Sequence, residues 1–392
     1  MVLGLMSGTS ADGVDAVLAR FQGHPSRPRW RILASHSQPY PPSLRDRLVA
    51  AGQGTALSSA DWLELAEAVT EEQAAAARAC DPAGHAALVG CHGQTVWHRP
   101  PSDQRRGASW QLLQSPLLAQ LLQRPVVADF RAADLALGGQ GAPLVPPADE
   151  ALIGRLAGWR ALLNLGGIAN LTLLPPAIGP DCRRPVRGWD CGPANTLIDL
   201  AIHHFSEGQL TYDADGAWAR QGRINETMID RWLQEDYVMS PPPKSTGREC
   251  FGQADLEQRL ADLATAAVSG GVPLAPADAL ATLTAFSAAV VAQDLRRGPR
   301  PLELLVAGGG SRNPVLMEQL RRRCHGTAVL PLSERGIADS EREALAFALL
   351  AWWHLKRHPS NAPSVTGARQ ACVLGVRVEP AGPEWNQDID HA

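Results

Sequence analysis

The chain opens with Val2-Leu-Gly-Leu-Met-Ser-Gly-Thr-Ser-Ala-Asp-Gly-Val-Asp15, in which a polar, glycine-containing segment separates two apolar runs. Apolar runs joined in this way are typical of a β-hairpin. Gly8 and Gly13 would let the backbone approach a ligand closely, and Thr9 and Ser10 can donate to phosphate oxygens. An ordinary hairpin turn, capped by its own Asp and Ser side chains, accounts for the segment equally well.

A second hairpin is predicted at residues 161–174, where Gly166-Gly167 separates two apolar runs. Two strand–glycine–strand units, each opening one half of the chain, indicate a duplicated domain. If the two domains faced each other across a cleft, a glycine hairpin from each side could hold a phosphate chain. Such a clamp differs from a P-loop.

Composition limits the class of protein. The chain has 392 residues, 45% hydrophobic and 19% charged, so it can bury one or two cores. A net charge of −4 gives no electrostatic basis for binding nucleic acid. No apolar run reaches the length of a membrane span, and no signal peptide is recognisable, so we expect no membrane association and a cytoplasmic location. Seven cysteines without a Cys-x-x-Cys pair indicate reduced thiols and no zinc site.

Helices are predicted at residues 57–80, 110–122, 197–205, 277–297 and 314–324. The passage 138–147 is rich in glycine and proline and reads as a domain boundary. We therefore predict an N-terminal domain at 1–135 and a C-terminal domain at 136–392. The C-terminal tail is free in this scheme to pack back on the first domain.

Polar residues follow two of the predicted strands, where open α/β sheets place ligand groups. His92 lies in one such segment, although a loop histidine bonded to backbone is the more ordinary interpretation. Arg131 follows another strand and could bind a carboxylate with its planar fork. It could equally pair with Asp129 or Asp134 at the surface.

Asp190 lies where a short strand meets a glycine-containing turn before a helix. It is either an Asx-turn or helix cap, or a carboxylate placed to take a proton from a nucleophile. Gly308-Gly-Gly310 follows a buried strand and would let a flat group such as adenosine lie on the backbone, whereas a plain connector needs at most one glycine. Ser340-x-x-Glu343 has the spacing of a capping box.

Two further patterns involve charged residues. Asp12 and Asp15 could hold a hydrated Mg²⁺ ion, which favours a few carboxylates plus water. Lys244-Ser-Thr246 has a superficial likeness to a Walker motif, but the glycine spacing of that motif is absent.

Six motifs occur in one order: Met6-Ser-Gly-Thr-Ser-Ala-Asp-Gly-Val-Asp15, His92-Gly-Gln-Thr95, Asn164-Leu-Gly-Gly-Ile-Ala-Asn170, Asp190-Cys-Gly-Pro-Ala-Asn195, Pro242-Pro-Lys-Ser-Thr-Gly-Arg-Glu249 and Gly308-Gly-Gly-Ser-Arg-Asn-Pro314. Together they resemble the anhydro-N-acetylmuramic acid kinases, a family of the actin-like sugar kinase superfamily. The resemblance runs from Gly4 to about Gly375.

The resemblance implies an α/β fold of two actin-like (ribonuclease H-like) domains, with mixed sheets and flanking helices around a central nucleotide and sugar cleft. It also implies a cytoplasmic homodimeric enzyme of cell-wall recycling that uses ATP and Mg²⁺. Water would open the 1,6-anhydro ring of 1,6-anhydro-N-acetylmuramic acid, and O6 would take the γ-phosphate to give N-acetylmuramic acid 6-phosphate and ADP.

Residue roles follow from the same resemblance. Asp190 matches the catalytic aspartate that activates water. The implied sugar contacts are His92, Gln94, Arg131 and Glu343. The implied nucleotide contacts are Gly8, Thr9, Ser10, Ala11, Asp12, Gly13, Val14, Asp15, Asn164, Gly166, Gly167, Gly308, Gly309, Gly310 and Asn313.

The sequence departs from the family pattern at two positions near the aspartate. Cys191 replaces the usual Thr and Ala194 the usual Gly, and either change could alter nucleotide affinity or rate. Two alternatives to the kinase remain open. One is a catalytically weak sugar-binding or regulatory protein that keeps the fold. The other is a superfamily member that acts on a different sugar or carboxylate.

Overall fold

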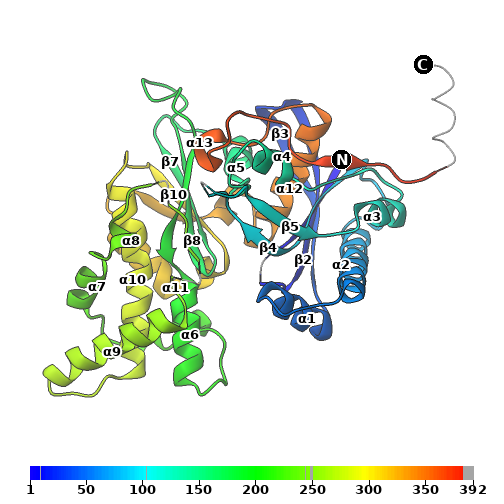
Figure 1. Cartoon of the computed structure of the whole chain (residues 1–392). Coiled ribbons are helices and arrows are strands. Elements are labelled where there is room, and N and C mark those ends of the chain that lie inside the picture. Colours follow the sequence, from blue (N-terminus) through cyan, green and yellow to red (C-terminus); the bar gives the residue numbers. More distant parts are fainter. Residues whose placement is uncertain (9, 103, 243, 248–249, 383–392) are drawn as a thin grey trace. The chain divides into compact units, whose positions relative to one another are not determined.

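The computed structural model describes residues 1–8, 10–102, 104–242, 244–247 and 250–382 (Figure 1). The chain divides into two compact units. Unit 1 comprises residues 1–154 and 340–392, and unit 2 comprises residues 155–339. Each unit has its own sheet and its own helices.

The elements of unit 1 are β1 (Val2–Ser7), β2 (Gly13–His24), β3 (Arg27–Pro39), α1 (Pro42–Gly52), α2 (Ser59–Cys80), β4 (Leu88–Arg99), β5 (Ala108–Leu112), α3 (Ser115–Leu122), β6 (Val126–Ala128), α4 (Ala132–Ala136), α5 (Pro146–Ile153), α12 (Asp339–Leu355), α13 (Pro363–Thr366) and β12 (Val376–Val378).

The elements of unit 2 are β7 (Arg160–Leu165), β8 (Ile168–Leu174), β9 (Arg187–Pro193), α6 (Asn195–Phe205), α7 (Glu226–Trp232), α8 (Asp236–Met239), α9 (Gln253–Ser269), α10 (Pro276–Arg296), β10 (Glu303–Ala307), α11 (Pro314–Arg323) and β11 (Ala328–Pro331), with 3₁₀ turns η1 (Ala214–Gly216), η2 (Ala219–Gln221), η3 (Gly309–Arg312) and η4 (Leu332–Arg335).

The two sheets share one strand order. In unit 1, β3, β2 and β1 are antiparallel neighbours, and β1, β4 and β6 run parallel. In unit 2, β9, β8 and β7 are antiparallel neighbours, and β7, β10 and β11 run parallel. The chain therefore folds as a duplicated mixed α/β unit, and both predicted hairpins, β1–β2 and β7–β8, are confirmed.

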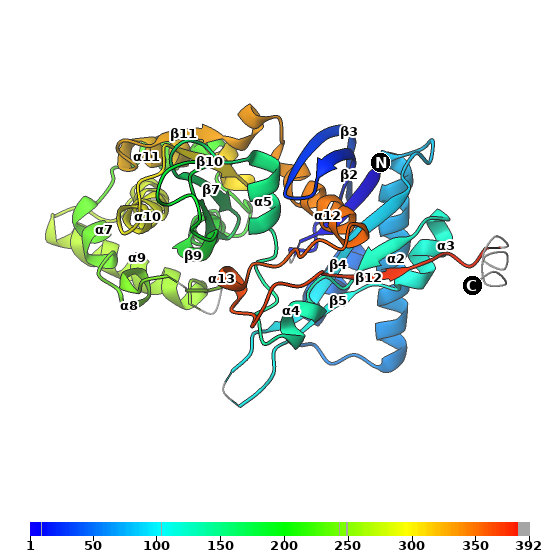
Figure 2. The same cartoon turned by 90° about the horizontal axis from the view of Figure 1, so that it is seen from above.

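The helix α12 lies against the sheet of unit 1 (Figure 2), and two glycines of that sheet make room for it. Gly4 and Gly90 are register partners on β1 and β4. A Cβ on Gly4 would overlap the carbonyl oxygen of Ala344, and one on Gly90 would overlap that of Phe347. Leu3 and Leu5, which flank Gly4 on β1, point to the other face of the sheet and join the core beneath α2. The sheet is therefore covered by helices on both faces.

The division of the chain differs from the predicted boundary at 135/136. Unit 1 extends to Gly154 because α5 packs on β3, with Trp30 Nε1 donating to the Leu152 carbonyl. The last segment also belongs to unit 1, because β12 pairs antiparallel with β6. Within the described residues, no helix combines the length and apolarity needed to cross a membrane.

Local predictions were mostly accurate, with one clear error. The helix α2 is present, and Ser58 and Asp61 form its capping box. The helix predicted at 110–122 is wrong in its first part, because residues 108–112 form β5 and pair with β4. Only α3 remains helical there. Cross-strand pairing overrides local helix preference at this position.

Candidate active site

Three side chains from neighbouring strands of unit 2 lie in one row. Asn164 on β7 is the register partner of Asn170 on β8, and Asn170 is the partner of Asp190 on β9. Paired residues on adjacent strands point to the same face of a sheet. Asn170 Nδ2 donates to Asp190 Oδ1 at 2.6 Å.

The other oxygen of Asp190 is held by the segment after α8. Ser245 Oγ donates to Asp190 Oδ2 at 2.9 Å, and the Thr246 backbone N–H donates at 3.0 Å. An ionised carboxylate has about four acceptor positions, and the described residues fill three of them, so they orient the group and leave one position for a ligand. The alternative of an Asx-turn or helix cap is wrong, because Asp190 lies within β9 and these donors lie outside its own turn.

Cys191 and Ala194 do not face this carboxylate. Cys191 is fully buried in the core of unit 2, since it points to the opposite face of β9 from Asp190. Burial raises the pKa of the Cys191 thiol well above its usual value, as does the nearby charge of Asp294. Ala194 is also fully buried, and its N–H donates to the Gly167 carbonyl. Both departures from the family pattern thus lie beneath the site.

Each hairpin has one glycine at which an added Cβ would clash with the protein and one, called open below, at which it would not. A Cβ on Gly13 would overlap the Gln38 carbonyl, and one on Gly167 would lie 2.7 Å from Thr196 Oγ1. A Cβ on Gly8 or Gly166 would meet no atom closer than 3.7 Å. Gly8 and Gly166 are therefore the glycines whose presence the protein's own packing does not explain. Thr9 lies outside the described residues.

The three glycines after β10 differ in the same way. Gly308 has φ +83°, and a Cβ there would lie 2.8 Å from the Leu165 carbonyl oxygen. A Cβ on Gly310 would lie 2.7 Å from Leu165 Cβ. Only Gly309 is open, with Arg312 as its nearest neighbour at 3.8 Å. Asn313, an implied nucleotide contact, caps α11 by accepting from Val315 N and Leu316 N.

Gln94 and His92, on β4 of unit 1, have polar atoms that already contact protein. Gln94 Oε1 accepts from Ser7 Oγ at 2.5 Å, and Gln94 Nε2 donates to the Gly8 carbonyl at 3.0 Å. His92 Nδ1 lies 2.8 Å from the Gly93 carbonyl, so Nδ1 carries the proton. His92 Nε2 then accepts from Arg131 Nη2 at 3.0 Å.

Arg131 and Glu343 retain capacity for a ligand. Arg131 Nη1 donates to the Gly141 carbonyl, whereas its buried Nε has no hydrogen-bond partner among the described residues. Burial lowers the pKa of Arg131 to about 10, and the charge of Glu343 opposes this shift. Burial raises the pKa of Glu343, against the opposing charge of Arg342. Glu343 is not part of a capping box, because α12 begins at Asp339 and Ser340 already lies within it.

The two magnesium candidates have different surroundings. Asp12 is exposed and pairs with Arg45 at 3.2 Å. Asp15 accepts from Ser37 Oγ at 2.5 Å, and burial raises its pKa. Among the described residues, no three His, Cys, Asp or Glu side chains are grouped to hold a metal ion. Mg²⁺ needs only one or two carboxylates when phosphates and water complete its shell, so Asp12 and Asp15 fit by type.

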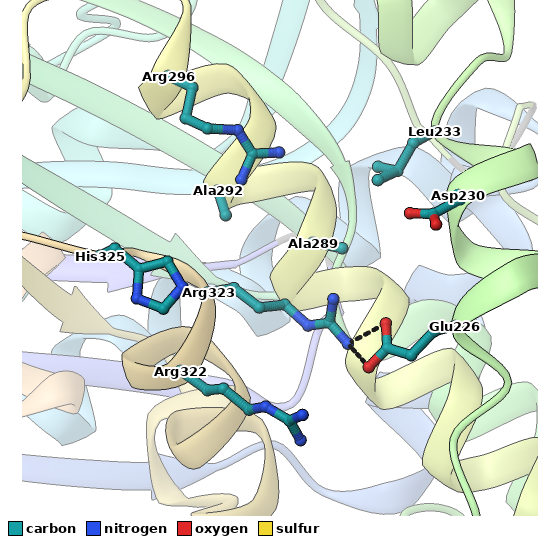
Figure 3. Close-up of a pocket in the computed structure, with 9 residues that line it drawn as sticks. All are labelled: Glu226, Asp230, Leu233, Ala289, Ala292, Arg296, Arg322, Arg323 and His325. Carbon is teal, nitrogen blue, oxygen red and sulfur yellow. Dashed lines mark hydrogen bonds and ion pairs between the residues drawn. The ribbon is translucent and has the colours of Figure 1, made fainter.

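A separate surface pocket of about 330 Å³ lies on α7, α10 and α11 of unit 2 (Figure 3). Arg323 and Glu226, two of the residues that line it, form an ion pair at 2.8 and 2.9 Å. None of the predicted site residues lines it.

The sequence-based site omitted four residues that the structure brings to it. Asn170, Ser245 and Thr246 hold Asp190, and Asn195 Nδ2 donates to the carbonyls of Leu165 and Gly166. All four lie within the six motifs, so motif membership was the available signal.

Comparison with known proteins matches the chain to one family of curated relatives. The model of the family described as anhydro-N-acetylmuramic acid kinase matches residues 1–380. A protein of that name from Synechococcus sp. (strain CC9902) is 64% identical over 96% of this chain and 99% of the relative. One from Prochlorococcus marinus (strain MIT 9303) is 64% identical over 97% of this chain and all of the relative. Among solved structures, an activator of 2-hydroxyisocaproyl-CoA dehydratase from Clostridium difficile with bound ADPNP has 14% identity and a TM-score of 0.41, covering 91% of this chain and 95% of that one.

Proposed function

The chain belongs to the anhydro-N-acetylmuramic acid kinase family, and from this premise we propose a reaction and a role for each site residue. The enzyme is a sugar kinase that uses ATP to phosphorylate 1,6-anhydro-N-acetylmuramic acid. Water opens the 1,6-anhydro ring, and the products are N-acetylmuramic acid 6-phosphate and ADP. The reaction serves the recycling of cell-wall sugar.

Asp190 is the general base in this proposal. Its carboxylate is held by Asn170, Ser245 and Thr246, and this is the observation that carries the assignment. Because the described residues that contact this carboxylate are all donors, the group is oriented as an acceptor and can take a proton from water. The water oxygen bonds to C1 while the C1–O6 bond breaks. O6 then takes the γ-phosphoryl group as its bond to ADP breaks, and the water proton passes to Asp190.

The remaining roles follow from charge and geometry. We assign Arg131 to the substrate carboxylate, because its guanidinium is oriented by Gly141 and His92 and keeps an unpaired Nε. Glu343 is assigned to the sugar as an acceptor. Gln94 supports the first hairpin loop through Ser7 and Gly8. The open glycines Gly8, Gly166 and Gly309 are assigned to the nucleotide, with the neighbouring loop residues around them.

Mg²⁺ is the proposed metal, and Asp15 and Asp12 are the residues that would hold it. When bound, the ion would neutralise charge on the phosphates of ATP. We also propose that the protein is a homodimer that acts in the cytoplasm. Light scattering on the purified protein tests the dimer: a mass of twice 41.8 kDa is expected.

The test of the reaction is a coupled ADP-release assay in ¹⁸O-labelled water, with ATP, Mg²⁺ and the anhydro sugar. We expect sugar-dependent turnover and label at the C1 hydroxyl of the product. Asp190→Asn should lower kcat by about 10²–10⁴-fold, the range of a positioned base. Wild-type turnover in Asp190→Asn would move the base elsewhere. No turnover in the wild type would favour a binding or regulatory protein. Turnover only with another sugar would favour a relative of different specificity.

A further inference from the structure

Lys244 is a buried lysine in the same segment as the two donors to Asp190. Its side chain is only 5% exposed, and Lys244 Nζ lies 3.1 Å from the Asp294 carboxylate. The ammonium also contacts the Val238 carbonyl at 3.4 Å and lies 5.1 Å from the centre of the Tyr237 ring. With the Tyr237 carbonyl at 3.5 Å as a third acceptor, all three N–H donors of the ammonium find partners within unit 2, and the group is turned away from solvent.

Asp294 is a buried carboxylate whose position is fixed by several partners. Its side chain is completely buried on α10 and accepts from Trp189 Nε1 at 3.0 Å and from Arg297 Nη1 at 3.1 Å. Trp189 immediately precedes Asp190 on β9. A buried carboxylate with one indole and two cationic partners holds those partners in place, because leaving it unpaired would be costly.

The backbone of Lys244 is joined directly to Asp190. The Asp190 N–H donates to the Lys244 carbonyl at 3.0 Å, and Tyr237 Oη donates to the Asp190 carbonyl at 2.8 Å. The next two residues, Ser245 and Thr246, supply two of the three hydrogen bonds to the Asp190 carboxylate. The position of Lys244 therefore sets the position of both donors.

We propose that Lys244 and Asp294 are positioning residues that fix the segment carrying Ser245 and Thr246, and so orient the Asp190 carboxylate for catalysis. The inference rests on the proposed role of Asp190 as base. It assigns Lys244 a function unlike that of a phosphate-binding lysine, despite the Lys-Ser-Thr sequence. To reach a phosphate, the ammonium would have to leave a buried carboxylate.

The first test compares kcat with KM for ATP in Lys244→Met and Asp294→Asn. Positioning predicts that both variants lose about 10–100-fold in kcat, as expected for a misplaced catalytic group, while KM for ATP changes less than about twofold. A phosphate-binding lysine predicts the opposite pattern. Lys244→Met would raise KM for ATP, and Asp294→Asn would leave kcat unchanged. That pattern overturns the proposal.

The second test removes a donor directly and keeps the proposal testable if Lys244→Met does not fold. Ser245→Ala removes one exposed donor to the Asp190 carboxylate and should lower kcat while KM for ATP changes little. Asp255→Asn is the matched control, since it removes a 2.9 Å pair to buried Arg259 away from this segment. It should lower the melting temperature without lowering kcat. An unchanged kcat in both Lys244→Met and Ser245→Ala overturns the proposal.

The third test separates this inference from the proposed function. In an Asp190→Asn background, Lys244→Met should cause little further loss, because both changes affect the same step. A full additional loss overturns the positioning role. Wild-type activity in Asp190→Asn alone overturns the proposed function and the inference with it. Loss in Asp190→Asn with wild-type behaviour of Lys244→Met and Asp294→Asn overturns only the inference.

Discussion

His92 is a buried histidine whose two ring nitrogens both have partners, and its protonation state follows from them. Nδ1 donates to the Gly93 carbonyl and Nε2 accepts from Arg131, so a second proton would place two positive groups in contact. Burial, aided by the Arg131 charge, lowers the pKa of His92 to about 3. The ring stays neutral throughout the physiological range and supports Arg131 as an acceptor.

This shift predicts a specific acid sensitivity. Between about pH 6.5 and pH 3 the unfolded chain binds a proton at His92 and the folded chain does not, so this site loses stability as the pH falls. From pH 7.5 to pH 5 the wild type should lose about 2 kcal/mol more unfolding free energy than His92→Gln. Urea titrations at the two values measure this. Exposed His24→Gln is the control, and an equal loss in wild type and His92→Gln would contradict the prediction.

Arg131 can be tested by a substitution that keeps its charge. Arg131→Lys cannot contact the Gly141 carbonyl, His92 and a substrate carboxylate together, because an ammonium lacks the planar fork. Losing a charge-assisted hydrogen bond should raise KM for the sugar about 10–100-fold. KM for ATP should change little. Arg184→Lys, an exposed pair with Asp181, is the control. An unchanged KM for the sugar in Arg131→Lys would exclude Arg131 as a sugar contact.

At the residue scale, the sequence motifs name candidate site residues but do not distinguish their roles. In the sequence, His92, Gln94 and Arg131 all come after predicted strands and are treated alike, whereas the structure has His92 and Gln94 within β4. The structure separates them, because His92 and Gln94 use their polar atoms on protein partners whereas Arg131 keeps an unpaired Nε. The two residues of such a hydrogen bond are 39 positions apart for Arg131 and His92 and 86 for Gln94 and Gly8, so local sequence patterns cannot reveal it. Asn170 and Ser245 were missed for the same reason.

At the scale of elements, the loop after β10 shows how packing and ligand binding share a glycine run. Gly308 and Gly310 are required by backbone conformation and by contact with Leu165, whereas Gly309 is open. Three consecutive glycines therefore carry less functional information than the sequence suggests. Two of them position the turn before α11, and only one remains to be explained by a ligand.

This separation predicts different outcomes for neighbouring substitutions. Gly309→Ala should leave the melting temperature unchanged and raise KM for ATP, because the added methyl meets only Arg312 at 3.8 Å in the protein. Gly310→Ala should cost about 1–3 kcal/mol through overlap with Leu165. Thermal unfolding and ATP titration of both variants measure the two effects. An unchanged KM for ATP in Gly309→Ala would remove the nucleotide from this loop.

At the scale of the whole molecule, the duplication was visible in the sequence but the path of the chain was not. Two glycine hairpins indicated two similar halves, and the matching strand orders bear this out. The return of residues 340–392 to unit 1 was only allowed for, because α12 reads locally as an ordinary apolar helix. Its place is fixed by Gly4 and Gly90, about 250 positions or more away, where the missing Cβ atoms make room for its backbone.

The path of the chain predicts how fragments behave. Residues 155–339 form one continuous segment with a complete sheet and a core drawn entirely from that segment, so this fragment should fold alone. Residues 1–154 lack α12 and β12, which leaves one face of β1 and β4 uncovered, so this fragment should aggregate. Joining 340–382 to it through a long Gly/Ser linker should restore folding. Near-UV circular dichroism and urea unfolding of the three proteins measure this. A cooperative transition in 1–154 alone would show that α12 and β12 are not needed for this part to fold. The absence of one in 155–339 would show that its own core is not sufficient.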